Sequence, residues 1–229
     1  MSTKQVNSRL PVLALLPLLG ALGGCAPTAV VGPRAVETRR QPPIEAKADA
    51  PAVKADRPEW KVGYEWQYSW KDHSGNGTLT KEIIREEPFA GVPAFVLKRG
   101  QSEDFYTKDV LGLLGTMSGG RITVKRTDPF QTLSWPLEVG KEWSNSYTVE
   151  RLGEKSSESF EHRVVVTKLE PIEVSAGTFD AFKIEIYNAR TGTLLNDYWY
   201  APEVKWFVKS RVYNREGVRE EELQSFKVD

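Results

Sequence analysis

The chain of 229 residues has one cysteine, Cys25, and two histidines, His73 and His162. Without a second cysteine it cannot form an internal disulfide, so a folded domain has to be held together by its hydrophobic core. Histidine and cysteine also supply most metal sites and many nucleophile–base pairs. His73 lies in an expected turn and His162 in an expected strand, and neither belongs to a closely spaced group of His, Asp and Glu. The sequence therefore predicts no metal site and no catalytic residues.

Common enzyme motifs are missing as well. No Gly-x-Ser-x-Gly nucleophile elbow occurs, and the glycines between residues 112 and 120 do not match a phosphate-binding or dinucleotide-binding loop. The pair Glu86–Glu87 precedes a proline turn and the acidic run 220–222 enters a strand, as solvated charge does, so neither indicates a catalytic carboxylate pair. We therefore expect a protein that is not an enzyme and binds no cofactor.

Neither sign of charge is in excess, because 31 Lys and Arg balance 31 Asp and Glu. No basic run interrupts this balance. Proteins that bind nucleic acids or anionic membrane surfaces through charge carry concentrated basic residues. We therefore expect no nucleic-acid partner and no polybasic membrane contact.

The first 24 residues have the layout of a secretory signal peptide. Residues 1–9 carry two basic side chains and no acid, and residues 10–22 form a leucine-rich run that two glycines close. A membrane-spanning helix needs about 20 apolar residues, and this run is shorter and is interrupted by Pro11 and Pro17. Residues 1–24 are thus predicted to be removed rather than kept as a membrane anchor.

Cys25 follows this leader directly. The tetrapeptide Leu22–Cys25 resembles the lipobox of bacterial lipoproteins, and the resemblance implies that Cys25 is lipidated and becomes the first residue of the mature protein. It also implies three acyl chains, which attach a protein to a membrane far more firmly than one chain does. Ala26 stands where aspartate would signal inner-membrane retention in enterobacteria, so we expect an outer-membrane lipid anchor with the domain in the periplasm. The alternative is that Cys25 is a small buried residue or a free thiol.

Residues 25–59 predict a disordered N-terminal tether. From Ala26 to Glu59 the chain is rich in alanine, proline and charged residues and has no aromatic residue, so it cannot build a core. Such a tether spans roughly 30 Å as a flexible coil and on the order of 100 Å as a polyproline-like segment. We expect it to hold the folded domain away from the membrane.

The composition changes at Trp60, and residues 60–229 are predicted to form one all-β domain. Aromatic and polar residues alternate from Tyr64 to Lys71, which is the period of a strand with one buried face. Residues His73–Gly77, which contain Asn76-Gly77, are predicted to form a hairpin turn. Short β-branched and aromatic runs separated by turn residues continue along the chain, so we expect roughly ten to twelve antiparallel strands.

Three pairs of similar segments indicate a duplication. The pairs are residues 61–70 with 138–147, 91–99 with 177–185, and 103–114 with 196–207. Their offsets grow from 77 to about 93 residues, so the two copies would need hairpins of different lengths; chance similarity between strands is the alternative. Two antiparallel meanders, residues 60–135 and 136–229, would have to cover their apolar faces. A sandwich, a curved sheet and an incomplete lipocalin-like barrel all meet that need.

Residues 137–228 resemble the DUF3108-like or TapB-like group of periplasmic lipoproteins of unknown function, through the phrases PLEVGKEW, VSAGTFDAFKIE, YWYAPEVKWFVKS and EELQSF. The resemblance implies a curved antiparallel sheet or barrel and brings no catalytic residues. Lys205 departs from it, because the group has glycine there, so we expect an altered turn before Trp206. The resemblance does not extend to residues 109–120, which we expect to be an irregular connection rather than a mobile flap.

Aromatic residues gather around that turn. Tyr198, Trp199 and Tyr200 precede it and Trp206 follows it, so their side chains point to both faces of a hairpin. One face has to be core. The other face is a candidate ligand-binding surface, and these four residues are the predicted binding residues. The alternative is that all four pack within the sheets.

These features predict a non-enzymatic lipoprotein of the cell envelope. In one hypothesis it is a structural or assembly module that offers a surface or an edge strand to another envelope protein. In the alternative it carries a lipid or another hydrophobic ligand within a curved β-domain. The long tether slightly favours the first hypothesis, whereas the aromatic stripe from Tyr64 to Trp70 favours the second.

Overall fold

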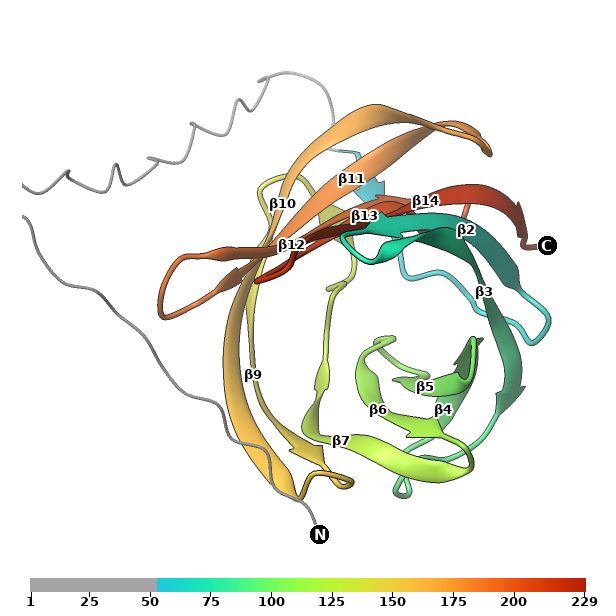
Figure 1. The fold of residues 1–229 in the computed structure, drawn as a ribbon. Helices are drawn as coiled ribbons and strands as arrows, with labels where there is room; N and C mark the ends of the chain where they lie inside the picture. The colour runs from blue at the N-terminus through green and yellow to red at the C-terminus, as the bar shows by residue number, and fades with distance from the viewer. Residues whose placement is uncertain (1–52) are drawn as a thin grey trace, which may run out of the picture. The chain divides into compact units, whose positions relative to one another are not determined.

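The computed structural model describes residues 53–229, and this part of the chain consists of strands, turns and irregular backbone (Figure 1). The predicted all-β class is thereby confirmed for these residues. No helix among them has the length and apolar character that crossing a membrane would need. The predicted signal peptide, the predicted lipidation site Cys25 and residues 25–52 of the predicted tether lie outside the described residues.

Within residues 53–229 the strands are β1 Lys54–Ala55, β2 Glu65–Asp72, β3 Gly75–Glu86, β4 Ala94–Arg99, β5 Ser102–Thr107, β6 Leu113–Ser118, β7 Arg121–Phe130, β8 Leu137–Glu138, β9 Glu142–Arg151, β10 Ser156–Val174, β11 Gly177–Asn188, β12 Leu194–Ala201, β13 Trp206–Asn214 and β14 Gly217–Lys227. Twelve of them form a closed antiparallel barrel in the order β10-β11-β12-β13-β14-β2-β3-β4-β5-β6-β7-β9, and β1 pairs with β8. The sequence left sandwich, sheet and barrel open, and the structure is a barrel. The short strands β1 and β8 were not expected.

Alternating residues define the inner and outer faces of the barrel. In β2, Trp66 and Tyr68 point inward and are fully buried, whereas Gln67 between them is exposed. In β11, Ile184 and Ile186 are fully buried and alternate with polar residues. Burying each large apolar side chain contributes about 1.5–3 kcal/mol. A register slip of one residue would turn these side chains outward, so the alternation fixes the pairing.

The apolar core fills one end of the barrel, which we call the closed end. Trp60, just before β2, packs against rings of four strands, with centroid distances of 6.0 Å to Trp66, 5.8 Å to Phe95, 5.4 Å to Tyr106 and 4.9 Å to Trp206. Its Nε1 donates to the Lys205 carbonyl in the β12–β13 turn at 3.3 Å. The chain entering β2 is therefore fastened beneath that turn.

The connection between β7 and β9, residues 131–141, completes the closed end. Trp135 in this connection packs against Tyr200 at 5.3 Å between centroids, and its Nε1 donates to the Val110 carbonyl of the β5–β6 turn at 3.3 Å. Leu137 is fully buried in the same core. Because the strands form antiparallel hairpins, the β5–β6 and β12–β13 turns lie at the same end, and both segments cover it.

The two halves of the barrel share a backbone turn before their first strand. Gly63 and Gly140 have φ angles of 92° and 89°, a left-handed conformation that glycine adopts without strain. Their N–H groups donate to the Ile83 and Val166 carbonyls, each at 2.8 Å. A duplication would leave such a match, and the repeat boundaries at residues 60–135 and 136–229 stay a prediction.

A second match concerns the turns at the closed end. Leu111 and Lys205 both have φ of 58°, and their N–H groups donate to the carbonyls four residues earlier, Thr107 at 3.1 Å and Ala201 at 3.0 Å. Lys205 thus adopts the conformation that glycine would take, and the turn before β13 is the counterpart of the β5–β6 turn. Residues 109–120 form part of that turn, β6 and the β6–β7 turn, so the expectation of an irregular connection is wrong.

Two strand pairs close the barrel by joining strands that are not consecutive along the chain. β14 pairs with β2 from Glu220 opposite Lys71 to Lys227 opposite Glu65. β7 pairs with β9 only over Val124–Arg126. We call this short closure the β7–β9 seam.

Side chains extend the β7–β9 seam beyond its backbone pairs. Asn145 Oδ1 accepts a hydrogen bond from Gln131 N, and Asn145 Nδ2 donates to Gln131 O, both at 3.0 Å. Trp143 Nε1 donates to the same carbonyl at 2.9 Å, and Thr148 N donates to Thr127 Oγ1 at 3.0 Å. Beyond the last backbone pair of the seam, the Asn145 side-chain amide therefore makes the two hydrogen bonds that a neighbouring strand backbone would make.

Candidate functional site

The structure places the four predicted binding residues on two faces of the sheet. Tyr198 and Tyr200 lie opposite Ile184 and Phe182 and point into the barrel, and Trp206 packs in the closed-end core. Tyr200 and Trp206 are buried, while Tyr198 keeps part of its surface accessible. The structure thus brings three of the four rings into the interior.

Trp199 points outward but is covered by its neighbours. Its Nε1 donates to Glu170 Oε1 at 2.9 Å, and the cationic groups of Lys183 and Arg211 each lie 5.4 Å from its ring centroid. Only 5% of Trp199 is exposed. The outer face of this hairpin therefore holds a covered ring, and ligand binding by any of the four residues stays a prediction.

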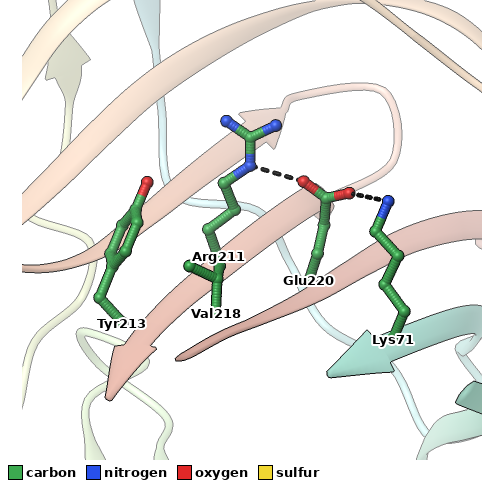
Figure 2. Close-up of a pocket in the computed structure, with 5 residues that line it drawn as sticks. All are labelled: Lys71, Arg211, Tyr213, Val218 and Glu220. Atoms are coloured by element: carbon green, nitrogen blue, oxygen red, sulfur yellow. Dashed lines mark hydrogen bonds and ion pairs between the residues drawn. The ribbon is translucent and has the colours of Figure 1, made fainter. Parts of the chain in front are cut away.

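A shallow hollow of about 380 Å³ lies on the outer face of β13, β14 and β2. It is lined by Lys71, Arg211, Tyr213, Val218 and Glu220 (Figure 2). Glu220 lies at its centre. One of its carboxylate oxygens is 2.8 Å from Lys71 Nζ, and the other is 2.6 Å from Arg211 Nε and 3.5 Å from Lys209 Nζ. Each oxygen thus already has a cationic partner.

The charge of Glu220 is fixed by this network. Burial alone would raise the pKa of Glu220, but hydrogen bonds from Lys71 and Arg211 and the charge of Lys209 outweigh burial and hold its pKa at about 2. The carboxylate is therefore ionised and neutralised by protein groups at pH 7. A site of this kind supports the sheet and has little free charge with which to recognise a ligand.

Inside the barrel, a first charged cluster surrounds Asp104 on β5. Asp104 lies opposite the core residue Leu97 and therefore faces inward, with 5% of its surface exposed. One of its oxygens accepts from Arg99 Nε at 3.1 Å and the other from Thr116 Oγ1 at 2.7 Å. Both oxygens of this buried carboxylate are therefore occupied.

A second inward cluster lies on β14, β2 and β3. Glu221 faces Trp70 across the β14–β2 pair, and its oxygens are 2.8 Å from Lys81 Nζ and 3.2 Å from Arg219 Nε. Arg219 also pairs with Asp72 at 2.8 Å. The inward cations of this cluster, like Arg99, have carboxylate partners.

Arg126 on β7 differs from these paired charges. It lies in the β7–β9 seam opposite Val149, and its Nε and Nη1 are buried without a hydrogen-bond partner among residues 53–229. Burial lowers the pKa of Arg126, and the nearby groups of Tyr147, Tyr106 and Asp104 oppose that shift. Arginine nevertheless stays protonated in proteins. A positive charge therefore faces the interior with unused donors.

Next to Arg126, Tyr147 and His162 form an inward polar pair. The Tyr147 hydroxyl is 3.3 Å from His162 Nδ1, and the rings of Phe130 and Phe160 lie 5.3–5.8 Å from both. Burial lowers the pKa of His162, so its imidazole is neutral at pH 7. The charge of Arg126 is thus bordered by neutral polar groups and aromatic rings.

The other histidine lies elsewhere. His73 Nε2 is 3.3 Å from a Glu216 carboxylate oxygen, and both side chains are largely exposed. Within residues 53–229, no group of three or more His, Cys, Asp or Glu side chains is arranged to hold a metal ion.

Sequence reasoning missed Arg126, although the strand pattern contains a signal for it. In the segment Arg121–Phe130, Ile122 and Val124 alternate with polar residues, and Arg126 continues the positions of the apolar residues. Arginine at an apolar position of an alternating strand is unusual, because unpaired charges are rarely buried. That position alone marks Arg126 as a residue that needs an explanation.

No family model matches the chain, and no curated protein matches it. The solved structures similar to it include three bacterial proteins. A predicted exported protein with a YmcC-like fold from Bacteroides fragilis has 15% identity and a TM-score of 0.41, over 77% of this chain and 100% of its own. A predicted lipoprotein from Parabacteroides distasonis has 13% identity and a TM-score of 0.37, over 76% and 99%. The hypothetical lipoprotein YmcC from Escherichia coli has 13% identity and a TM-score of 0.36, over 71% and 84%. These values assign neither a family nor a function to this chain.

Proposed function

We propose that this protein is a non-enzymatic lipoprotein of the cell envelope and that its barrel binds a hydrophobic or amphiphilic ligand. The observation that carries ligand binding is the partial accessibility of four inward-facing rings, Tyr106, Phe130, Phe160 and Tyr198. Protein interiors are normally packed as densely as organic crystals. Because these rings point into a closed barrel and still keep accessible surface, the space that they face is not completely filled by protein atoms.

The chemistry of this region supports the proposal. The rings of Phe130 and Phe160 surround the Tyr147–His162 pair, and the two inward charged clusters hold their polar groups in fixed pairs. Small-molecule sites have this composition, with an apolar lining and a small number of fixed polar groups. Because Trp60 and the connection 131–141 cover the closed end, a ligand would enter from the opposite end of the barrel.

The outer surface offers less to a protein partner. Each of the twelve barrel strands has a hydrogen-bonded neighbour on both sides over part of its length, so an added strand could pair only with short edges such as residues 156–161 of β10. Large apolar side chains exposed on the described surface come from separate turns and strands: Val53, Val62, Val92, Ile122, Leu152, Val218 and Phe226. Docking surfaces usually gather such residues in one patch. The geometry therefore favours the ligand hypothesis over the assembly hypothesis.

The proposed location rests on the sequence alone. Lipidation of Cys25 would anchor the protein to the outer membrane and leave the domain in the periplasm. Cys25→Ser should abolish labelling with a radioactive or clickable fatty acid and should move the protein from the membrane fraction or leave its leader uncleaved. Fatty-acid labelling that persists in this variant would contradict the lipobox assignment.

Ligand binding is tested by native mass spectrometry of the full-length protein purified from its own host, followed by organic extraction. Wild type is compared with Val124→Trp, which adds a ring to the interior, and with Val218→Trp, which adds the same ring to the outer face. Circular dichroism checks that both variants keep a β-type spectrum. A small molecule that copurifies with wild type and Val218→Trp and is lost from Val124→Trp supports the proposal. An empty wild-type protein contradicts it and directs the search to a protein partner.

A further inference from the structure

We infer that Arg126 recognises the anionic head group, a carboxylate or a phosphate, of an amphiphilic ligand bound in the barrel. This inference rests on the proposed function and adds to it the charge of the ligand and the residue that recognises it.

Other cations inside the barrel have carboxylate partners. Arg99 pairs with Asp104, and Lys81 pairs with Glu221. The charge of Asp104 acts on Arg126 and raises its pKa, but the Asp104 oxygens already accept hydrogen bonds from Arg99 and Thr116. Arg126 is therefore left with Nε and Nη1 buried and unpartnered within the described chain.

Burying the unpaired Arg126 guanidinium costs folding free energy. A guanidinium cannot lose its proton to escape burial, and a charge that is removed from water without a partner destabilises the fold. A bound oxyanion would neutralise this charge and accept hydrogen bonds from Nε and Nη1. The interior position of Arg126 thus specifies the sign of the ligand's charge.

The surroundings of Arg126 are mostly aromatic and apolar. The Tyr147 hydroxyl lies beside the guanidinium, and Val149 lies opposite Arg126 on the neighbouring strand. Phe130 and Phe160 pack around Tyr147 at 5.3 and 5.7 Å between centroids. A small inorganic anion would not cover the surface that Phe130 and Phe160 leave accessible, whereas an amphiphile would place its head at Arg126 and its tail along these rings.

The test titrates the full-length protein, held in lipid nanodiscs, with octanoate, octyl phosphate, methyl octanoate and inorganic phosphate by isothermal calorimetry. Empty nanodiscs provide the blank. Wild type is compared with Arg126→Gln and with Arg211→Gln, which removes an arginine from the outer face. Hydrogen bonds to charged groups are strong enough that octanoate and octyl phosphate should bind wild type and Arg211→Gln at least about tenfold more tightly than the ester. Arg126→Gln should reduce this preference to less than about twofold while retaining ester binding.

Each other result has a distinct meaning. Equal affinity of wild type for octanoate and its ester, or a preference that survives in Arg126→Gln, overturns the inference and leaves the proposed function intact. Inorganic phosphate that binds as tightly as octyl phosphate overturns the assignment to a head group and identifies a free anion as the ligand. Octyl compounds that fail to bind wild type at all overturn both the inference and the proposed function.

A second variant gives a readout that does not depend on any added ligand. Arg126→Met keeps the apolar stem and removes the unpaired charge, so the delipidated protein should melt a few degrees higher than wild type. If Arg126 instead holds the barrel together, the same variant melts lower. A lower melting temperature would therefore overturn the inference.

Discussion

The charge of Glu220 on the outer face is paired, whereas the charge of Arg126 on the inner face is not. On the outer face, Glu220 is held between Lys71 and Arg211, and its oxygens have a cation at 2.8 Å or less. On the inner face at the β7–β9 seam, the Arg126 guanidinium has two buried nitrogens without a partner. Ion pairs at a solvated surface contribute little each, whereas an unpaired internal charge is costly. The network around Glu220 is thus explained by the fold itself, whereas the unpaired charge of Arg126 is the observation on which the proposed head-group recognition rests.

The largest expected effect separates the closed-end core from the outer face. Trp66 is fully buried and its Nε1 donates to the Val204 carbonyl at 2.9 Å. Trp66→Ala should lower the free energy of unfolding by about 3–5 kcal/mol, because it leaves a cavity and an unpaired carbonyl. Val218→Ala on the outer face is the control and should change it by less than about 0.5 kcal/mol. Urea denaturation measures both, and similar losses in the two variants would break the comparison.

A smaller effect is expected at the β7–β9 seam. Asn145→Leu removes both hydrogen bonds to Gln131, so unfolding should become easier by about 2 kcal/mol and the Gln131 amide should exchange faster with solvent. Ser146→Leu, on the exposed face of the same strand, is the matched control. Unchanged exchange at Gln131 in Asn145→Leu would show that the seam closes without this side chain.

The outer network should matter less and in a pH-dependent way. The pKa of Glu220 is lowered to about 2 in the folded protein, so its contribution is present at neutral pH and is lost as the pH falls from about 4.5 towards 2. Glu220→Gln should cost about 1 kcal/mol at pH 7 and flatten this acid transition. Glu216→Gln, in an exposed turn, is the control. Thermal melts between pH 2 and 7 measure both, and parallel curves for wild type and Glu220→Gln would refute the network.

The smallest expected effect concerns the neutral histidine beside Arg126. Because burial lowers the pKa of His162, the unfolded chain takes up a proton before the folded one as the pH falls below about 6.5, and stability decreases. His162→Gln should remove this decrease, which we expect to be below about 1 kcal/mol. The exposed His73→Gln provides the control. A stability profile between pH 7 and 5 that is the same in wild type and His162→Gln would contradict the neutral state.

The strands could be predicted from the sequence because their side chains alternate. The segment Tyr64–Lys71 shows the period of two along its length, and burial of Trp66 and Tyr68 is what makes β2 pair in one register. The antiparallel all-β class follows from such local patterns. Closure of the barrel does not, because it depends on β14 meeting β2 and on an amide, Asn145, replacing backbone pairs at the other seam.

The candidate site was harder to predict than the fold. The aromatic residues at 198–200 suggest a binding surface by their number. Burial of a ring in a barrel and exposure of a ring to a ligand, however, produce the same alternating pattern. Strands β1 and β8 have two residues each and no strand pattern of their own. Arg126 is informative only once its neighbours are known, since the sequence does not show which carboxylates are already occupied.

The attachment of the chain at the closed end has a mechanical consequence. Residues that arrive from the N-terminal side first pass β1, which pairs with β8 in the connection between β7 and β9. They then pass Trp60, which packs among four rings and donates to the Lys205 carbonyl. Tension on the preceding chain therefore acts first on the two-residue β1–β8 pair and reaches the core at Trp60 only after that pair has separated. A pull through the N-terminal segment would thus load the connection of the β7–β9 seam before it loads the core.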